Sequence, residues 1–246
     1  MAFLFLLPML SVVTLLVLAE RLSGVRNTDW LRNLAAWALG LAAAILFVPL
    51  WPSYHGASLI DGTKLPVWLG FPLYLIVQDL GEYLYHRAQH QVPALWAMHS
   101  LHHSDPAMSA LTTARHFWGD QLVKTLTVWA ASAMIISPGP AFVAAYGVAS
   151  LWNFFAHAAL PVSFGRWSWL INAPAYHRRH HSRLPEHYNT NFAALFPIFD
   201  VVAGSYYRPE GFPPTGLAHR PETAADLIVW PLRYWQRNRR SAPLTA

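Results

Sequence analysis

The sequence contains no cysteine and few charged residues. Of its 246 residues, 12% are charged and 54% are hydrophobic, whereas charged residues make up about 25% of an ordinary soluble domain. The lack of cysteine excludes disulfides, thiolate zinc sites, iron–sulfur clusters and a cysteine nucleophile. With 12 Trp and 13 Phe and a mean hydropathy of +0.26, the composition also excludes a disordered chain. It indicates a membrane protein rather than a cytosolic one.

Several functional motifs are missing as well. The sequence has no phosphate-binding glycine loop, no His-Glu-x-x-His zinc motif and no His-Pro-Gly-Gly haem motif. The formal net charge is +5, but no broad basic stripe with interleaved aromatic residues accompanies it. We therefore expect no nucleic-acid partner and attribute the basic excess to the charge bias of membrane proteins.

Long apolar runs predict the fold class. Runs of about 20 residues span a bilayer as helices. The sequence predicts an all-α membrane protein with four to five membrane helices, near 2–19, 30–51 and 65–85 and in a 117–160 hairpin. The first run has no basic start and no small-residue cleavage site, so we interpret it as a retained span rather than a signal peptide. The hairpin is divided by Ser137-Pro138-Gly139-Pro140, and it either crosses the membrane or enters it only in part.

The distribution of basic residues predicts the topology. If the N-terminus lies outside, the outer loops 52–64 and 137–140 contain one of the 17 basic residues, Lys64. The positive-inside rule then places the C-terminus in the cytoplasm. We interpret residues 1–246 as one integral-membrane domain, in which 161–246 form a cytoplasmic helical cap and tail. Residues 224–236 are predicted to lie along the membrane interface, with Trp230, Tyr234 and Trp235 as anchors.

Histidine is the residue type that stands out. The chain has 13 histidines, and most of them recur at spacings i, i+3 and i+4, which share one face of a helix. Neutral imidazole binds zinc, copper, iron or nickel. One ion cannot use nine ligands but two adjacent ions can, so the spacing predicts a nitrogen-rich site for two metals. The predicted ligands are His86, His90, His99, His102, His103, His157, His177, His180 and His181.

The motifs around these histidines resemble a known family. The segments Tyr83 to His90, Leu95 to Ser104, Leu111 to His116, Asn172 to Ser182 and Asn191 to Ser205 are similar to the histidine boxes and flanking motifs of the fatty acid hydroxylase/sterol desaturase superfamily of membrane di-iron enzymes. The sequences of these motifs resemble those of the bacterial branch and of alkylglycerol monooxygenases. Phe192-Ala193 stands where the family has Tyr-Gly, and Phe199 replaces Trp. These differences affect the assignment of the branch and the substrate, but not the assignment of the metal ligands.

The resemblance implies an activity and its cofactors. It implies two iron ions, which zinc can replace in a purified protein, and O2 activated with two electrons to attack a C–H bond. The implied product is a hydroxylated fatty-acyl, sterol, carotenoid or ether lipid, and a desaturase using the same site is the alternative. The electrons would come from a separate electron-transfer protein or a reduced pterin. The implied location is a bacterial inner membrane, with the histidine boxes cytoplasmic and membrane lipids around the spans.

Other polar residues are predicted to support the metals. Ligating histidines donate their second N–H to a carboxylate or carbonyl, and acids near a membrane span are costly unless functional. For Glu82 the alternative is a simple ion pair with Arg87, and for Asp200 it is a helix cap. The candidates for this supporting role are Asp79, Glu82, Asp200 and Asn191.

The remaining polar candidates have separate predicted roles. Asn153, one turn before His157, is expected to hold a bridging water. His187 is a candidate further ligand or a neighbour of the ligands, and His116 is a candidate support. We place His55 and His219 at the solvent or an interface.

Two functions of other classes remain as alternatives. A metal transporter with histidine-lined sites would have its ligands at mid-membrane depth on opposed spans, whereas these histidines cluster at predicted helix ends. A zinc hydrolase needs an open metal position and a nearby general base, and nine histidines exceed what it needs.

Overall fold

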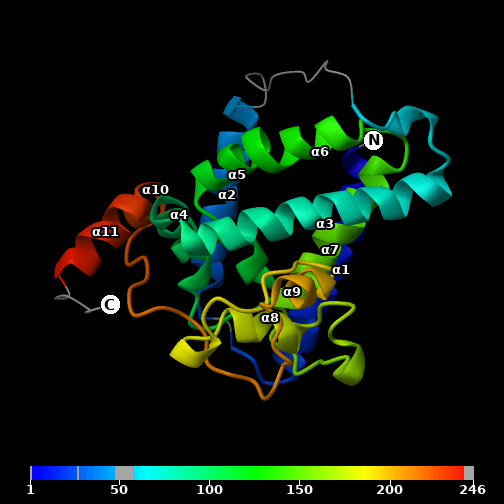
Figure 1. Cartoon of the computed structure of the whole chain (residues 1–246). Coiled ribbons are helices and arrows are strands. Elements are labelled where there is room, and N and C mark those ends of the chain that lie inside the picture. The colour runs from blue at the N-terminus through cyan, green and yellow to red at the C-terminus, as the bar shows by residue number, and fades with distance from the viewer. Residues whose placement is uncertain (1, 27, 48–57, 241–246) are drawn as a thin grey trace.

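The computed structural model describes residues 2–26, 28–47 and 58–240, and this part of the chain is helical without β-strands. Two isolated β-bridges join Ile60 to Ile136 and Ser182 to Thr215. The longer helices are α1 (Ala2–Leu22), α2 (Trp30–Phe47), α3 (Val67–Gln91), α4 (Pro93–His103), α5 (Trp118–Lys124), α6 (Ala130–Ile135) and α7 (Phe142–His157) (Figure 1). The later ones are α8 (Pro174–His180), α9 (Ile198–Ala203), α10 (Ala224–Ile228) and α11 (Trp230–Arg240). The all-α prediction is confirmed for the described residues.

The predicted apolar runs correspond to helices with shifted ends. The run 2–19 lies in α1 and the run 30–51 begins with α2, although residues 48–51 fall outside the described part. In the described residues, only α2 is both long and apolar enough to cross a membrane. Helix α3 continues six residues beyond the predicted end at Tyr85 and so carries His86 and His90.

The hairpin region is built from several elements. A single turn of π-helix, η4 (Thr125–Trp129), joins α5 to α6, and a loop at Ser137–Pro140 leads to α7, as the Pro/Gly pattern predicts. A Cβ atom on Gly139 would lie 2.0 Å from the carbonyl oxygen of Gly62, so only glycine fits there. The buried core on this side gathers Tyr74 from α3 with Ile136 and Ala145.

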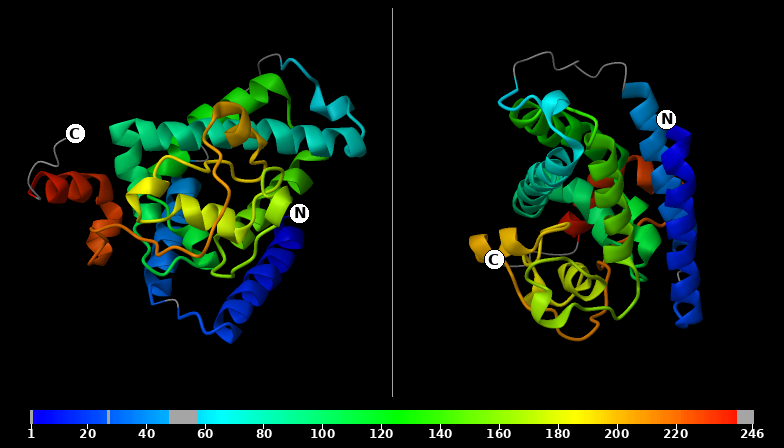
Figure 2. Two further views of the ribbon diagram at one scale, coloured as in Figure 1. Left: turned by 60° about the horizontal axis from the view of Figure 1, so that its bottom comes forward. Right: turned by 90° about the vertical axis from the view of Figure 1, so that its right-hand side faces the viewer.

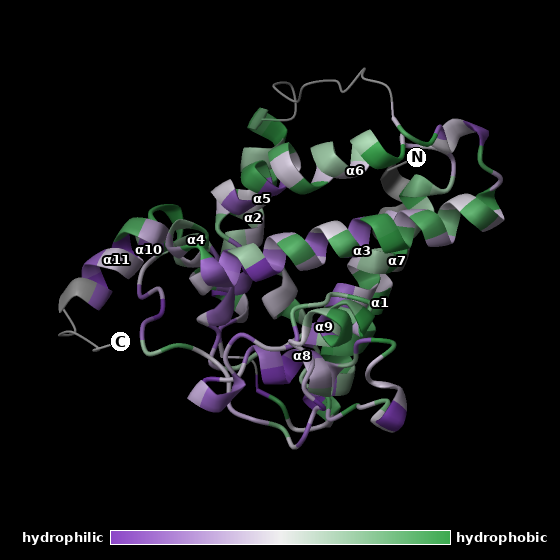
Figure 3. Cartoon of the chain, viewed as in Figure 1, coloured by the Kyte–Doolittle hydropathy of each residue, from purple (hydrophilic) through white to green (hydrophobic). Residues whose placement is uncertain are grey.

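The later part of the chain lies against the ends of the long helices. Helices α8 and α9 and their loops lie together below α3 and α7 in Figure 1, and Figure 2 shows the same group facing the viewer on the left. In this group α8 and the neighbouring loops are rich in hydrophilic residues, whereas α9 is mainly hydrophobic, as are α3 and α7 away from the group (Figure 3). Helix α11 packs against α4, and α10 packs against α2.

A buried polar network joins α2 to the segment after α4. The guanidinium of Arg115 is fully buried and donates to Asp29 Oδ2 at 3.1 Å and to Asn33 Oδ1 at 3.0 Å. It also donates to the carbonyl of Leu101 at 3.1 Å and to Ser104 Oγ. Buried charges in proteins are normally paired in this way. The network fixes α4, which carries three of the predicted ligands.

A second buried acid ties α1 to the same region. Glu20 at the end of α1 accepts hydrogen bonds from the N–H groups of Ala110 and Ala159, each at 2.7 Å. The sequence reasoning did not select Glu20 or Asp29, although an acid at the end of an apolar run signals a fixed role in a membrane protein.

Candidate metal centre

The structure brings all nine predicted ligands together and divides them into two neighbouring groups. The ligand atoms of each group lie within 4.8 Å of one another. The five-histidine group consists of His86, His90, His99, His103 and His180. The four-histidine group consists of His102, His157, His177 and His181.

Helices α4 and α8 contribute to both groups. Each starts with a proline, Pro93 or Pro174, whose fixed φ suits the first helical position. In α4, His99 and His103 lie one turn apart and face the first group, while His102 faces the second. In the triplet at the end of α8, His180 belongs to the first group, and His177 and His181 belong to the second. The two groups are therefore neighbours held by the same two helices.

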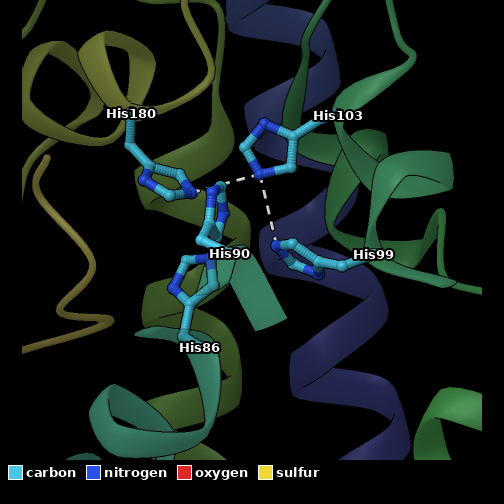
Figure 4. A group of neighbouring side chains, drawn as sticks. All are labelled: His86, His90, His99, His103 and His180. Carbon is cyan, nitrogen blue, oxygen red and sulfur yellow. Dashed lines mark hydrogen bonds between the residues drawn. The ribbon is translucent and has the colours of Figure 1, made fainter. Parts of the chain in front are cut away.

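Distances between imidazole nitrogens fit metal coordination. In the five-histidine group, His103 Nε2 lies 3.2 Å from His99 Nε2 and 3.1 Å from His180 Nε2 (Figure 4). In the four-histidine group, His157 Nε2 lies 3.0 Å from the Nε2 atoms of both His102 and His177. Two nitrogens bound at right angles to one ion, each about 2.1 Å away, lie about 3.0 Å apart. The side chains present thus fit a metal ion in each group.

The second ring nitrogen shows which atom is left for a metal. The Nδ1–H groups of His86, His157 and His180 donate to the carbonyls of Phe192 at 2.7 Å, Asn153 at 2.8 Å and Thr190 at 2.9 Å. A carbonyl only accepts, so each Nδ1 carries the hydrogen and each Nε2 keeps its lone pair.

Buried ring nitrogens without a partner support the same assignment. The Nε2 atoms of His86, His90 and His181 are buried and have no hydrogen-bond partner among the residues that the structure describes. Unpaired buried polar atoms are rare in proteins, and a metal ion would satisfy these three.

Burial keeps these imidazoles in the form that binds metals. His99, His102 and His103 are each exposed by 4% or less, and burial lowers the pKa of each ring well below its usual value. Burial likewise lowers the pKa of His180 to about 4. The imidazoles are therefore neutral near pH 7, and neutral imidazole is the metal ligand.

Two buried carboxylates hold the loop whose carbonyls orient the ligands. Asp79 accepts from the N–H groups of Leu195 at 2.8 Å and Phe196 at 2.7 Å. Asp200 accepts from the N–H groups of Phe192 at 3.0 Å and Ala193 at 2.8 Å. Because Phe192 and Thr190 supply the carbonyls for His86 and His180, both acids act on the five-histidine group through the loop 190–196. Neither acid contacts an imidazole directly, so the support reaches the ligands by a different route from the one predicted.

The other two predicted supports have structural contacts. Among the described residues Glu82 pairs with Lys124 at 2.7 Å and not with Arg87, so the alternative is wrong. Arg87 instead donates to the hydroxyl of Tyr83. Asn191 adopts a left-handed backbone conformation with φ of 59°. Its side chain accepts from the N–H of Tyr207 at 2.7 Å and donates to the carbonyl of the same residue at 2.9 Å.

The remaining candidates lie around the groups. The backbone carbonyl of Asn153 accepts from His157, and Asn153 also lines a cavity beside the histidines. His116 stacks on His102 with ring centres 4.4 Å apart, and its Nδ1 lies 3.4 Å from Asp120 Oδ2. His187 and His219 belong to neither histidine group. His55 lies outside the described residues.

A cavity of about 450 Å³ opens beside both groups. His86 and His99 of the first group and His102, His157 and His177 of the second line it. Small or apolar residues of α2 also line it, namely Ala36, Trp37, Gly40, Leu41 and Ala44, and so do the charged residues Glu82, Asp120 and Lys124. Trp37 and Leu41 are 48% and 45% exposed. The cavity therefore lies between the histidines and the helix that is apolar enough to meet lipid.

In its described residues the protein is all-helical, and two histidine groups that could hold metal ions lie beside a cavity. The family model described as fatty acid hydroxylase matches residues 71–205, which include all nine clustered histidines. The chain belongs to the fatty acid hydroxylase family.

Three relatives illustrate the range of this family. Alkylglycerol monooxygenase of Xenopus tropicalis is 27% identical over 173 residues, 70% of this chain and 37% of the relative. The ornithine lipid hydroxylase OlsE of Rhizobium tropici is 27% identical over 157 residues, 64% of this chain and 47% of the relative. The Delta(7)-sterol 5(6)-desaturase ERG3A of Gibberella zeae is 26% identical over 140 residues, 57% of this chain and 38% of the relative. The chain spans less than half the length of each, and no solved structure matches it.

Proposed function

We propose that the protein is a membrane oxidoreductase that uses two irons and O2 to hydroxylate a lipid-like substrate. The observation that carries this proposal is the cavity that is lined both by histidines of the two groups and by small or apolar residues of α2. A lipid chain that enters past α2 would bring one carbon next to both groups. The names of the relatives support the same chemistry, since they include two lipid oxygenases and a sterol desaturase.

The residues have distinct roles in this proposal. The five-histidine group would hold one iron and the four-histidine group the other. Bound iron would supply O2 activation with two electrons from a separate electron-transfer protein or a reduced pterin. The carbonyls of Phe192, Thr190 and Asn153 fix the orientation of three imidazoles. The apolar wall of α2 excludes water from the reacting carbon, which limits side reactions.

Hydroxylation is favoured over desaturation by the relatives that cover more of the chain. The alkylglycerol monooxygenase covers 70% of it and the sterol desaturase covers 57%. A desaturase remains the second candidate, because the same centre could remove a second hydrogen from the substrate. The histidine-lined transporter is less well supported, since the ligands come from helix ends and from α8 rather than from the middle of opposed spans.

We also propose the membrane placement that the charge distribution predicts. Helices α1, α2 and α3 and the hairpin of α5 to α7 would cross or enter a bacterial inner membrane, with the N-terminus outside. The histidine boxes, residues 161–246 and the C-terminus would face the cytoplasm as part of one integral-membrane domain. The apolar composition of α2 supports this placement.

Lipid analysis with labelled oxygen tests the function. Membranes that contain the iron-loaded protein or its His157→Ala variant are given an electron donor and 18O2, and their lipids are analysed by mass spectrometry. We expect one lipid class to gain one labelled oxygen atom with the wild-type chain only. A product that loses the mass of two hydrogens would identify a desaturase. An unchanged lipid profile despite full iron loading and an active reductant would contradict the proposal.

A further inference from the structure

The C-terminal helices α10 and α11 lie outside the residues that the family model matches, 71–205. We propose that they form a membrane-surface arm that binds the anionic head groups of the leaflet around the start of α2. The occupant is a phospholipid surface rather than another protein. This proposal depends on the membrane placement of α2 and not on the chemistry of the metal centre.

One face of the arm is fixed to the protein. Trp230 is fully buried, and its Nε1–H donates to Ser100 Oγ at 2.9 Å. Tyr234, one turn later, accepts from Trp96 Nε1 at 2.7 Å. Trp230 packs with Leu101 of α4 and Leu227 of α10. The predicted anchor role of Trp230 is therefore wrong, because its ring lies in the core.

The opposite face is apolar and exposed. Leu232 is 57% exposed and Trp235 is 42% exposed, and they follow each other at helical spacing. Ile228, at the end of α10, is 50% exposed. An exposed helix face of Leu, Ile and Trp beside arginines is typical of helices that lie in the membrane interface.

The arm continues a surface that already meets lipid in the proposed placement. Ala35 and Leu39 of α2 pack against the cluster of Leu227 and Trp230. At the start of α2, Leu31 is 64% exposed. The arm thus contacts α2 five and nine residues after its start at Trp30, and α10 and α2 are neighbours.

The positive charge of α11 favours anionic lipids. The sequence of α11 contains four arginines and no acid, and α11 begins on the side that the positive-inside rule assigns to the cytoplasm. Arg233 keeps 49% of its side chain exposed while it pairs with Asp226 at 3.4 Å, and Arg237 pairs with Glu222 at 3.4 Å and with Asp226 at 3.3 Å. Arginines next to an interfacial helix strengthen binding to anionic lipids. Phosphatidylglycerol is the probe for this surface.

Spin labelling suits this chain, because it has no native cysteine. The full-length chain is placed in nanodiscs of phosphatidylcholine alone or mixed with phosphatidylglycerol. Single labels are attached in the variants Leu232→Cys and Trp235→Cys. Asn238→Cys, on the flank of the same helix, and Arg183→Cys, on an exposed loop after α8, are the matched controls.

We expect labels at 232 and 235 to collide more with O2 than with a water-soluble nickel chelate, and more so in discs with phosphatidylglycerol. Both control labels should stay accessible to the chelate. Full accessibility of 232 and 235 to the chelate would overturn the proposal, as would equal burial in both lipid mixtures. Dipolar broadening between copies would identify a second chain as the occupant and would also overturn it.

A measurement on the unmodified chain guards against damage by the substitutions. Hydrogen–deuterium exchange of α11 should be slower in discs with phosphatidylglycerol than in discs of phosphatidylcholine alone. Equal exchange in the two would overturn the proposal independently of any label.

Discussion

His103 and His180 bring their Nε2 atoms within 3.1 Å of each other although 77 positions separate them in the sequence. One belongs to α4 and the other to α8. Each helix also sends a histidine to the neighbouring group, so a shift of either helix would disturb both groups at once. The two metals proposed here are therefore expected to depend on each other's supporting structure while keeping separate ligands.

Removing one ligand should release mainly the metal of its own group. His103→Ala removes a ligand of the five-histidine group, and His157→Ala removes one of the four-histidine group. We expect each variant to fall from about two metals per chain to about one and to lose turnover. Elemental analysis of purified protein measures this. His219→Ala, outside both groups, should keep both metals, and full activity of either ligand variant would show that the assignment is wrong.

The loop 190–196 should control the five-histidine group through Asp79. In Asp79→Asn, one oxygen that accepts from Leu195 or Phe196 becomes an NH2 group, which repels the backbone N–H. Loss of such outer support weakens metal affinity by about 10- to 100-fold, and competition with a chelator measures the change for each metal. Asp61→Asn affects an exposed pair with Lys64 and exposed hydrogen bonds from Thr63, and it should leave the affinity for both metals unchanged. An equal loss from both groups would contradict transmission through the loop.

The guanidinium of Arg115 should be a stability determinant. Arg115→Met leaves the buried carboxylate of Asp29 without this partner, and breaking a buried pair costs about 3–5 kcal/mol. We expect the free energy of unfolding in detergent to fall by that amount. Adding Asp29→Asn should recover part of the loss, because it removes a buried charge that has lost Arg115, although Arg32 also pairs with Asp29 at 2.7 Å. The exposed substitution Arg26→Gln should stay within about 0.5 kcal/mol of the wild type.

The cavity beside α2 should be blocked by a large side chain at Gly40. A Cβ atom on Gly40 would meet no other atom within 4 Å, and Gly40 lines the cavity. Gly40→Ala should therefore be tolerated, whereas Gly40→Phe should raise KM or abolish turnover with both metals retained. Lipid turnover and metal content are measured on the same preparations. Unchanged turnover in Gly40→Phe would show that substrate uses another path.

The local part of the metal centre could be predicted from sequence. Residues at i, i+3 and i+4 share a helix face by backbone geometry alone, which is why His99, His102 and His103 were identified as ligands. Their division between the two groups depends on how α4 and α8 meet, and no local pattern encodes that. The boundary of α3 was placed too early because the polar residues before His86 resemble the end of a span.

The supports of the ligands were less accessible to sequence reasoning. The partners of His86 and His180 are backbone carbonyls of the loop 190–196, and every residue type carries a carbonyl. Asp79 was selected as an acid near a membrane span, but its partners are backbone N–H groups far along the chain. Likewise, Trp230 fits an interfacial pattern by composition, whereas its full burial and its hydrogen bond to Ser100 show that it faces the core.

Mössbauer spectroscopy of protein loaded with 57Fe tests the central claim most directly, because it counts iron sites and reports their ligands. We expect two iron signals of equal area, each with nitrogen-rich coordination, and we expect His103→Ala and His157→Ala each to remove a different one. A single iron signal, or two signals that disappear together in both variants, would contradict two adjacent sites with separate histidine ligands.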